Sequence, residues 1–194
     1  KNAAGYFIRH PMDFIDFFIG SEGTLGVITA IELALVPKPE LMLRYVAFFH
    51  AESDALDFVQ SIKKRSNNKS DTISPSALEY FDVYSLDLLR RKRAGEGSKS
   101  TIPAFPDYAR AAVYLEQEGG NDDLENYCSA YLELLAECNA SGEDTWGAIQ
   151  KAEMEKISQF RYAVPEEINS IIVDRQRTCP EIHKIGTDFS VPDD

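Results

Sequence analysis

Long apolar runs, cysteines and targeting signals are all scarce in this sequence of 194 residues. It has no run of about 18 apolar residues, which excludes a typical transmembrane helix, and no signal-peptide pattern. Its three cysteines, Cys128, Cys138 and Cys179, form neither an even disulfide set nor a CxxC motif. We interpret them as half-buried apolar side chains in a reducing compartment. The sequence thus predicts a cytoplasmic protein, with peripheral attachment to a membrane left open.

Positive charge is also scarce, because 20 Lys and Arg residues stand against 32 Asp and Glu residues, for a formal net charge of -12. This excess argues against nucleic acid or an anionic membrane as a general partner. The basic run at 90–93 is interpreted as a solvated helix end. His10, His50 and His183 are far apart in the sequence, so they predict no metal site.

The apolar fraction of 44% is enough for a sizeable core, and its pattern alternates between strand-like and helix-like segments. Strands are predicted at 41–50, within 72–82, at 109–119 and at 183–191. Helices are predicted at 51–66, at 121–140, at 147–160 and from Pro165 to 177. A further helix is predicted to follow the strand within 72–82 and to end at Arg93. This order favours an α+β fold, with one sheet and helices on one of its faces. The ferredoxin-like plait is the specific prediction.

Three glycines recur at every third position in "FFIGSEGTLGVITAIELALVPKP", residues 17–39. This spacing matches neither the dinucleotide fingerprint nor the P-loop. It is typical either of a turn before an edge strand or of backbone amides that approach a cofactor. A strand is predicted at 27–36, and Pro37 and Pro39 end it. We place a domain boundary near 38–40.

Residues 1–6, "KNAAGY", and 16–39, "DFFIGSEGTLGVITAIELALVPKP", together resemble the end of the FAD-binding domain of the FAD-linked oxidases. These form the vanillyl-alcohol oxidase/p-cresol methylhydroxylase superfamily. The glycolate oxidase FAD subunit and D-lactate dehydrogenase branch is the most similar. "RYAVPEEIN" (161–169) and "TDFSVP" (187–192) are similar to two signatures of the family's C-terminal cap domain. The resemblance implies an FAD-binding domain end at 1–40 and a ferredoxin-like cap at 41–194.

The same resemblance implies roles for individual residues. The backbone that lines the flavin is expected at Gly20, Ser21, Gly23, Thr24, Gly26 and Val27. Arg161 is expected to bind the substrate carboxylate, because a guanidinium suits bidentate capture of that group. The alternative for Arg161 is an ion pair with Glu166 or Glu167. Lys184 is a weaker candidate for the substrate site, since Gly186 occupies the slot that matches the family's lysine.

Family members run to more than twice this length, and the sequence begins with Lys. The family's pyrophosphate-binding glycine loop would lie upstream of Lys1, and its histidine-bearing metal motif downstream of Asp194. We therefore expect a fragment, incomplete in both domains and inactive alone. Its apolar residues 7–19 would then lack their usual partner and mediate homo-oligomers.

The sequence thus predicts part of a flavin-dependent oxidoreductase that oxidises a 2-hydroxyacid, with hydride transfer to FAD. An electron acceptor or an iron–sulfur partner would complete the cycle, and a general base is not assigned. Two alternatives stay open. One is a non-catalytic ferredoxin-like module for small-molecule binding or interaction, and the other is a flavin oxidase for an uncharged alcohol.

Overall fold

The computed structural model describes residues 6, 8, 10–68 and 71–185. Residues 38–180 form one compact unit, and residues 1–37 with 181–194 are assigned to a second. The described residues of the first unit contain four strands and four α-helices. In chain order these are β1 (Leu41–Phe49), α1 (Glu52–Ser66), β2 (Ala77–Phe81), α2 (Val83–Glu96), β3 (Ala111–Gly119), α3 (Leu124–Glu137), β4 (Trp146–Ala148) and α4 (Lys151–Gln176). Short 3-10 turns, η2 (Gly97–Lys99) and η3 (Asn121–Asp123), flank β3.

The four strands form one antiparallel sheet in the order β2-β3-β1-β4. The central pair runs in register from Leu41 opposite Gly119 to Phe49 opposite Ala111. The edge strands pair antiparallel as well, β2 with β3 and β4 with β1. This order follows from two strand–helix–strand units, β1-α1-β2 and β3-α3-β4, whose strands interleave. The predicted α+β class and ferredoxin-like plait are confirmed.

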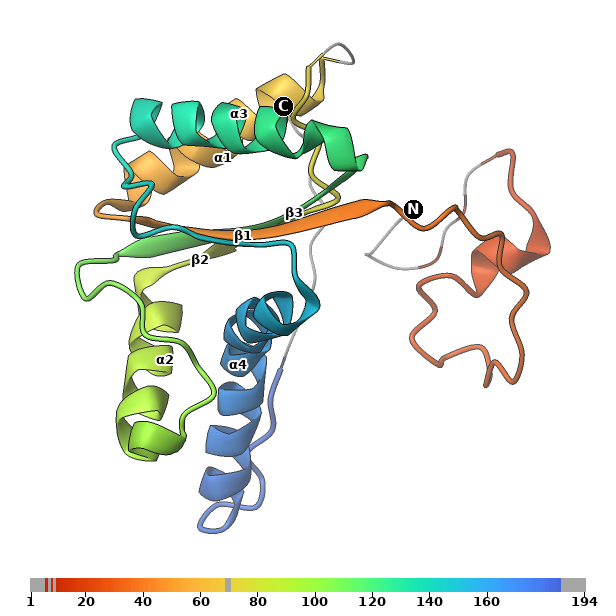
Figure 1. The fold of residues 1–194 in the computed structure, drawn as a ribbon. Coiled ribbons are helices and arrows are strands. Elements are labelled where there is room, and N and C mark those ends of the chain that lie inside the picture. The colour runs from red at the N-terminus through yellow and green to blue at the C-terminus, as the bar shows by residue number, and fades with distance from the viewer. Residues whose placement is uncertain (1–5, 7, 9, 69–70, 186–194) are drawn as a thin grey trace. The chain divides into compact units, whose positions relative to one another are not determined.

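Helices cover both faces of this sheet, with α1 and α3 on one face and α2 and α4 on the other (Figure 1). The prediction of helices on a single face is therefore wrong. The extra layer arises because α2 is inserted between β2 and β3, and α4 follows β4. A sheet covered on both faces needs apolar side chains on both faces of its central strands.

The strand β1 meets this requirement along most of its length. Tyr45 and Phe49 pack into the core under α1 and α3, whereas Val46 and Phe48 pack into the core under α2 and α4. Successive side chains of a strand point to opposite faces, so an almost continuous apolar run fills two cores. On the second face, Phe48 packs edge-to-face against Phe160 of α4, with ring centroids 6.0 Å apart.

The region after residue 145 differs from its prediction. Residues 146–148 form the short edge strand β4, and one helix, α4, replaces the two helices expected at 147–160 and 165–177. Pro165 lies inside this helix instead of at the start of a new one. A proline removes one backbone hydrogen bond of a helix. The preceding turns are anchored in the core by Ile157 and Phe160, so the helix continues through it.

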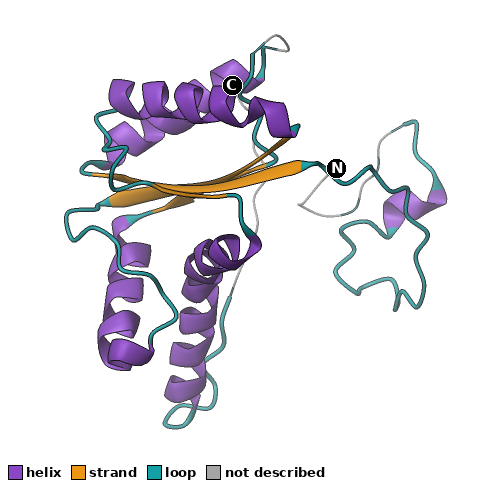
Figure 2. Ribbon diagram, viewed as in Figure 1, coloured by secondary structure: helices purple, strands orange, loops and turns teal. Residues whose placement is uncertain are grey.

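The described part of the second unit is mostly irregular, as Figure 2 shows by its loop colouring. Its one described helical turn is η1 (Phe14–Phe17), which Asp13 caps through the backbone amides of Ile15 and Asp16. The strand expected at 27–36 does not form. A strand needs a partner for its backbone groups, and the described residues supply none. The strand expected at 183–191 is absent at 183–185, and its remainder lies outside the described residues.

Candidate functional site

An open cleft of about 550 Å³ lies between β2 and α4. Arg161 and Pro165 of α4 both line it, because residues i and i+4 share one face of a helix. Glu79 and Phe81 of β2 line it from the sheet, because residues i and i+2 share one face of a strand. The cleft thus combines a charged pair with apolar walls, which is the usual character of a small-molecule site.

Arg161 is bound to Glu79 across this cleft. Its Nε donates to both carboxylate oxygens of Glu79 at 2.9 Å, and its Nη2 also donates to Oε1. These hydrogen bonds, more than the ion pair's charge, raise the pKa of the Arg161 guanidinium above its ordinary value. Arg161 is therefore fully charged at any physiological pH, and one edge of its guanidinium is occupied.

Two aromatic rings lie beside the same guanidinium. Its Cζ lies 5.2 Å from the ring centroid of Tyr114 and 5.2 Å from that of Tyr162. Nη1 also donates to the Tyr162 hydroxyl at 3.4 Å. Cations are attracted to aromatic faces at such distances, so Arg161 is held by its ion pair and by cation–π attraction together.

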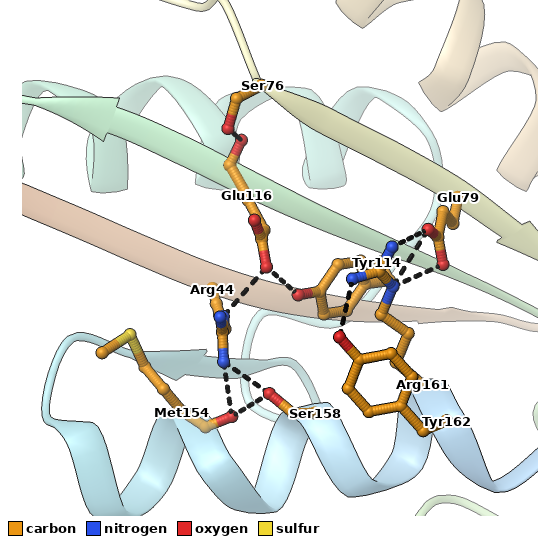
Figure 3. Close-up of polar contacts among 9 residues, drawn as sticks. All are labelled: Arg44, Ser76, Glu79, Tyr114, Glu116, Met154, Ser158, Arg161 and Tyr162. Atoms are coloured by element: carbon orange, nitrogen blue, oxygen red, sulfur yellow. Dashed lines mark hydrogen bonds and ion pairs between the residues drawn. The ribbon is translucent and has the colours of Figure 1, made fainter. Parts of the chain in front are cut away.

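A second polar network adjoins Arg161 through Tyr114, as Figure 3 shows. The fully buried Tyr114 donates its hydroxyl proton to Glu116. Glu116 accepts from Arg44 Nε at 2.9 Å, and Arg44 Nη1 reaches the Met154 carbonyl at 3.3 Å and the Ser158 hydroxyl. Burial, followed by the hydrogen bond to Glu116, raises the pKa of Tyr114. The network ties β1 and β3 to α4.

Sequence reasoning missed Glu79, Tyr114 and the Arg44–Glu116 pair. The sequence did contain a signal for the Arg44–Glu116 pair. Each of these charged residues stands in an otherwise largely apolar strand segment, "LMLRYVAFF" or "AAVYLEQEG". The alternative reading of Arg161, an ion pair with Glu166 or Glu167, is wrong about the partner. Arg161 binds Glu79, and Glu167 instead accepts from Lys92 Nζ at 3.1 Å.

The glycine segment belongs to the second unit, and its backbone explains its glycines. Gly20, Gly23 and Gly26 all have positive φ, at 81°, 78° and 152°, a region that other L-residues rarely adopt. A Cβ added at Gly23 or Gly26 would meet nothing within 4 Å. The described residues thus leave the backbone bare at these two positions.

The other predicted flavin residues differ in environment. Thr24 donates its hydroxyl to the Ser21 carbonyl at 2.6 Å and bonds the Tyr6 hydroxyl at 2.7 Å. Ser21 is buried, whereas Val27 is 91% exposed. A bare glycine backbone beside an exposed apolar side chain leaves room for the flat ring of a flavin, whose dimethylbenzene edge is apolar. The residues present thus fit the ring portion of FAD.

Lys184 and Arg161 lie in different units, so a shared site for the two stays a prediction. His10, His50 and His183 are all described. No group of three or more His, Cys, Asp or Glu side chains among the described residues could hold a metal ion. Within the same residues, every helix is too short or too polar to cross a bilayer.

We compared the sequence of this chain with those of known proteins. No protein-family model matches the chain. Glycolate oxidase subunit GlcD of Bacillus subtilis (strain 168) is 32% identical over 125 residues, which are 64% of this chain and 22% of that protein. GlcD of Escherichia coli (strain K12) is 28% identical over 66% of this chain and 23% of its own length. A probable mitochondrial D-lactate dehydrogenase of Danio rerio is 26% identical over 75% of this chain and 25% of its own length.

The solved structure of alkyldihydroxyacetonephosphate synthase shares the fold, with a TM-score of 0.55 over 86% of this chain and 32% of that chain, at 20% identity. These matches support the FAD-linked oxidase family for this chain. The resemblance seen in the sequence is thereby confirmed at the level of the FAD-linked oxidase family. The matched segments span about a quarter or less of the curated relatives.

Proposed function

We propose that this chain is part of a flavin-dependent oxidoreductase that oxidises a 2-hydroxyacid of the glycolate or D-lactate type. The names of the relatives, glycolate oxidase subunits and a probable D-lactate dehydrogenase, support this substrate class. The observation that carries the proposal is Arg161, a guanidinium that lines an open cleft. A permanently charged arginine favours an acid over a neutral alcohol.

FAD is the proposed cofactor, and residues 1–40 are proposed as the end of its binding domain. Gly20, Gly23 and Gly26 would hold it with their backbone, supported by Ser21, Thr24 and Val27. When bound, FAD supplies the hydride acceptor. Residues 41–194 would form the cap that binds and orients the acid. An electron acceptor or an iron–sulfur partner would reoxidise the enzyme.

Arg161 can orient a carboxylate without releasing Glu79. Glu79 occupies the Nε and Nη2 side of the guanidinium. Nη1 donates to the Tyr162 hydroxyl at the long distance of 3.4 Å, a bond that a second carboxylate would displace. Glu79 and the rings of Tyr114 and Tyr162 restrict the rotamers of Arg161. Little side-chain entropy is then lost on binding, and the acid is held in one orientation for reaction.

Substitution of Arg161 tests this role in the longer FAD-loaded protein that the proposal requires. We expect Arg161→Gln to weaken binding of D-lactate or glycolate by roughly 10- to 100-fold, since a hydrogen bond to a charged group is worth about 1.5–3 kcal/mol. Arg161→Lys should lose less, because it keeps the charge but not the fork. The measurement is the dissociation constant of each acid, with propanediol as the uncharged comparison.

Arg177→Gln is the matched control, because Arg177 is an exposed arginine near the end of the same helix. It should bind the acids as the wild type does. Unchanged acid binding in a folded Arg161→Gln protein would overturn the clamp. An equal loss for acid and diol would favour the alternative of an uncharged alcohol.

The second candidate function is a non-catalytic ferredoxin-like binding module. The ion pair itself favours it, because Glu79 already satisfies Arg161 within the fold. Under this alternative, Arg161→Gln and Glu79→Gln should lower the free energy of unfolding by similar amounts, and neither should alter the binding of acids. Binding and unfolding measured on the same variants separate the two functions.

A further inference from the structure

A second open cleft, of about 660 Å³, lies beside the edge strand β4. Two loops line it, residues 104–108 before β3 and residues 143–146 leading into β4. Its walls combine three aromatic side chains, Phe105, Tyr108 and Trp146, with three carboxylates, Asp107, Glu143 and Asp144. The proposed function uses none of them. We propose that this cleft binds a small organic cation with a methylated ammonium head group.

Each of the three aromatic side chains is held by a neighbour. Phe105 stacks on Phe48 at 5.8 Å and lies 5.1 Å from the Arg90 guanidinium, so Tyr108 and Trp146 are the rings left to meet a ligand.

Tyr108 stacks on His50, with ring centroids 3.8 Å apart and planes 13° apart. Trp146 packs edge-to-face against Phe48 at 4.9 Å and Phe160 at 5.4 Å. Tyr108 and Trp146 are both half-buried, so each ring is anchored in the fold and still borders the cleft. Aromatic rings around a cavity bind quaternary ammonium groups through cation–π attraction.

The charge around the cleft selects the sign of the ligand. Asp107, Glu143 and Asp144 are exposed at its rim. They outnumber the nearby cation Arg90, whose Cζ lies 5.1 Å from the Phe105 ring centroid and whose charge is paired within α2. Like charges at one rim repel an anion and attract a cation. A methylated ammonium also costs less to dehydrate than a small inorganic cation, so it suits a wall of aromatic rings better.

The two loops are fixed relative to each other before any ligand arrives. The Tyr108 hydroxyl donates to Asp144 Oδ2 at 2.7 Å, which joins one loop to the other. Arg90 Nη2 donates to three carbonyls in residues 106–109, at 3.2, 3.2 and 2.8 Å. Arg90 is itself paired with Asp87 at 2.8 Å. A preformed site loses less entropy on binding than a mobile one.

Trp146 is the one tryptophan of the 194 residues, so its fluorescence reports directly on this cleft. The experiment titrates this chain with choline and, separately, with dimethylbutanol, in which a neutral carbon replaces the ammonium nitrogen. We expect a saturable change in Trp146 fluorescence with choline alone, weakened by added salt. An equal response to the neutral alcohol, or no saturable response to choline, would overturn the proposal.

Glu143→Gln and Asp144→Asn remove one rim charge each while keeping the side-chain size. Each should weaken choline binding about fivefold, the equivalent of about 1 kcal/mol. Glu125→Gln is the control, because Glu125 is exposed on α3, which packs on the other face of the sheet. If Asp144→Asn fails to fold by circular dichroism, Glu143→Gln decides. Unchanged affinity in folded Glu143→Gln would contradict the assigned site.

Discussion

Single residues in this fold are defined by what surrounds them, and Arg161 is the clearest case. Its position in "FRYAVPEEIN" marked it as a candidate from sequence. Its partner, Glu79, lies 82 residues away in the chain, and no local pattern links the two. The pair leaves Arg161 charged and oriented, and its Nη1 donates to the neighbouring Tyr162 hydroxyl. The environment of Arg161 thus depends on a contact that only the folded sheet creates.

Tyr45 allows a prediction about alkaline stability. Its buried ring stacks on Tyr131 at 5.6 Å. Burial, more than the charge of Cys128, raises the pKa of Tyr45 to about 12, against about 10 in an unfolded chain. The folded state therefore keeps its proton longer. This contribution to stability is complete below about pH 10 and is lost as the pH rises toward about 12.

Tyr45→Phe should therefore flatten the fall in unfolding free energy between about pH 9 and about pH 11, as the unfolded tyrosine titrates near pH 10. Urea denaturation at the two pH values measures the fall. Tyr84→Phe is the control, since Tyr84 is 78% exposed, and it should keep the wild-type slope. The same slope in Tyr45→Phe as in the wild type would contradict the account of Tyr45.

Among the helices and strands, those whose apolar residues follow a regular period along the sequence were predictable. The strands β1 and β3 and the helices α1 and α3 form close to their predicted ranges, because their apolar residues follow the periods of strand and helix. Residues 27–36 had the composition of a strand, but they lack a pairing partner among the described residues. Proline is typical of the first residue of a helix, which predicts a helix start at Pro165, whereas core contacts of Phe160 carry α4 through it.

Pro165 gives a test at the scale of that helix. A proline inside a helix has no N–H to donate to the carbonyl four residues earlier, which belongs to Arg161. We expect Pro165→Ala to raise the free energy of unfolding by about 1–3 kcal/mol, as measured by urea denaturation. Glu166→Ala, next to it and exposed, should change stability by less than about 0.5 kcal/mol. A loss of stability in Pro165→Ala would show that α4 requires the proline.

For the molecule as a whole, the two units differ in how they bury apolar surface. The unit at 38–180 fills a core on each face of its sheet. In the described part of the other unit, large apolar side chains stay exposed, among them Phe14 at 76%, Ile15 at 67% and Val27 at 91%. Apolar patches of this kind usually mark a surface that contacts another protein. Residues 7 and 9 of the segment 7–19 lie outside the described residues.

We therefore expect this chain, expressed alone, to form dimers or higher oligomers through residues 7–19. The double substitution Phe14→Ser with Ile15→Ser should shift it to monomer, because it removes the two exposed side chains of η1. Leu56→Ser, at a 44% exposed position of α1, is the control and should leave the oligomers intact. Light scattering across a range of concentrations makes the measurement. A wild-type monomer at every concentration would contradict the prediction.

The measurement that tests the central claim most directly is anaerobic flavin reduction in the longer protein that contains this chain. With FAD bound, addition of glycolate or D-lactate should bleach the flavin absorbance in a single turnover. Propanediol, which lacks the carboxylate that Arg161 is proposed to bind, should leave it unchanged. Two results would contradict the proposed function. One is an FAD-loaded protein whose flavin is reduced by neither acid, and the other is a flavin that propanediol reduces as fast as the acids do.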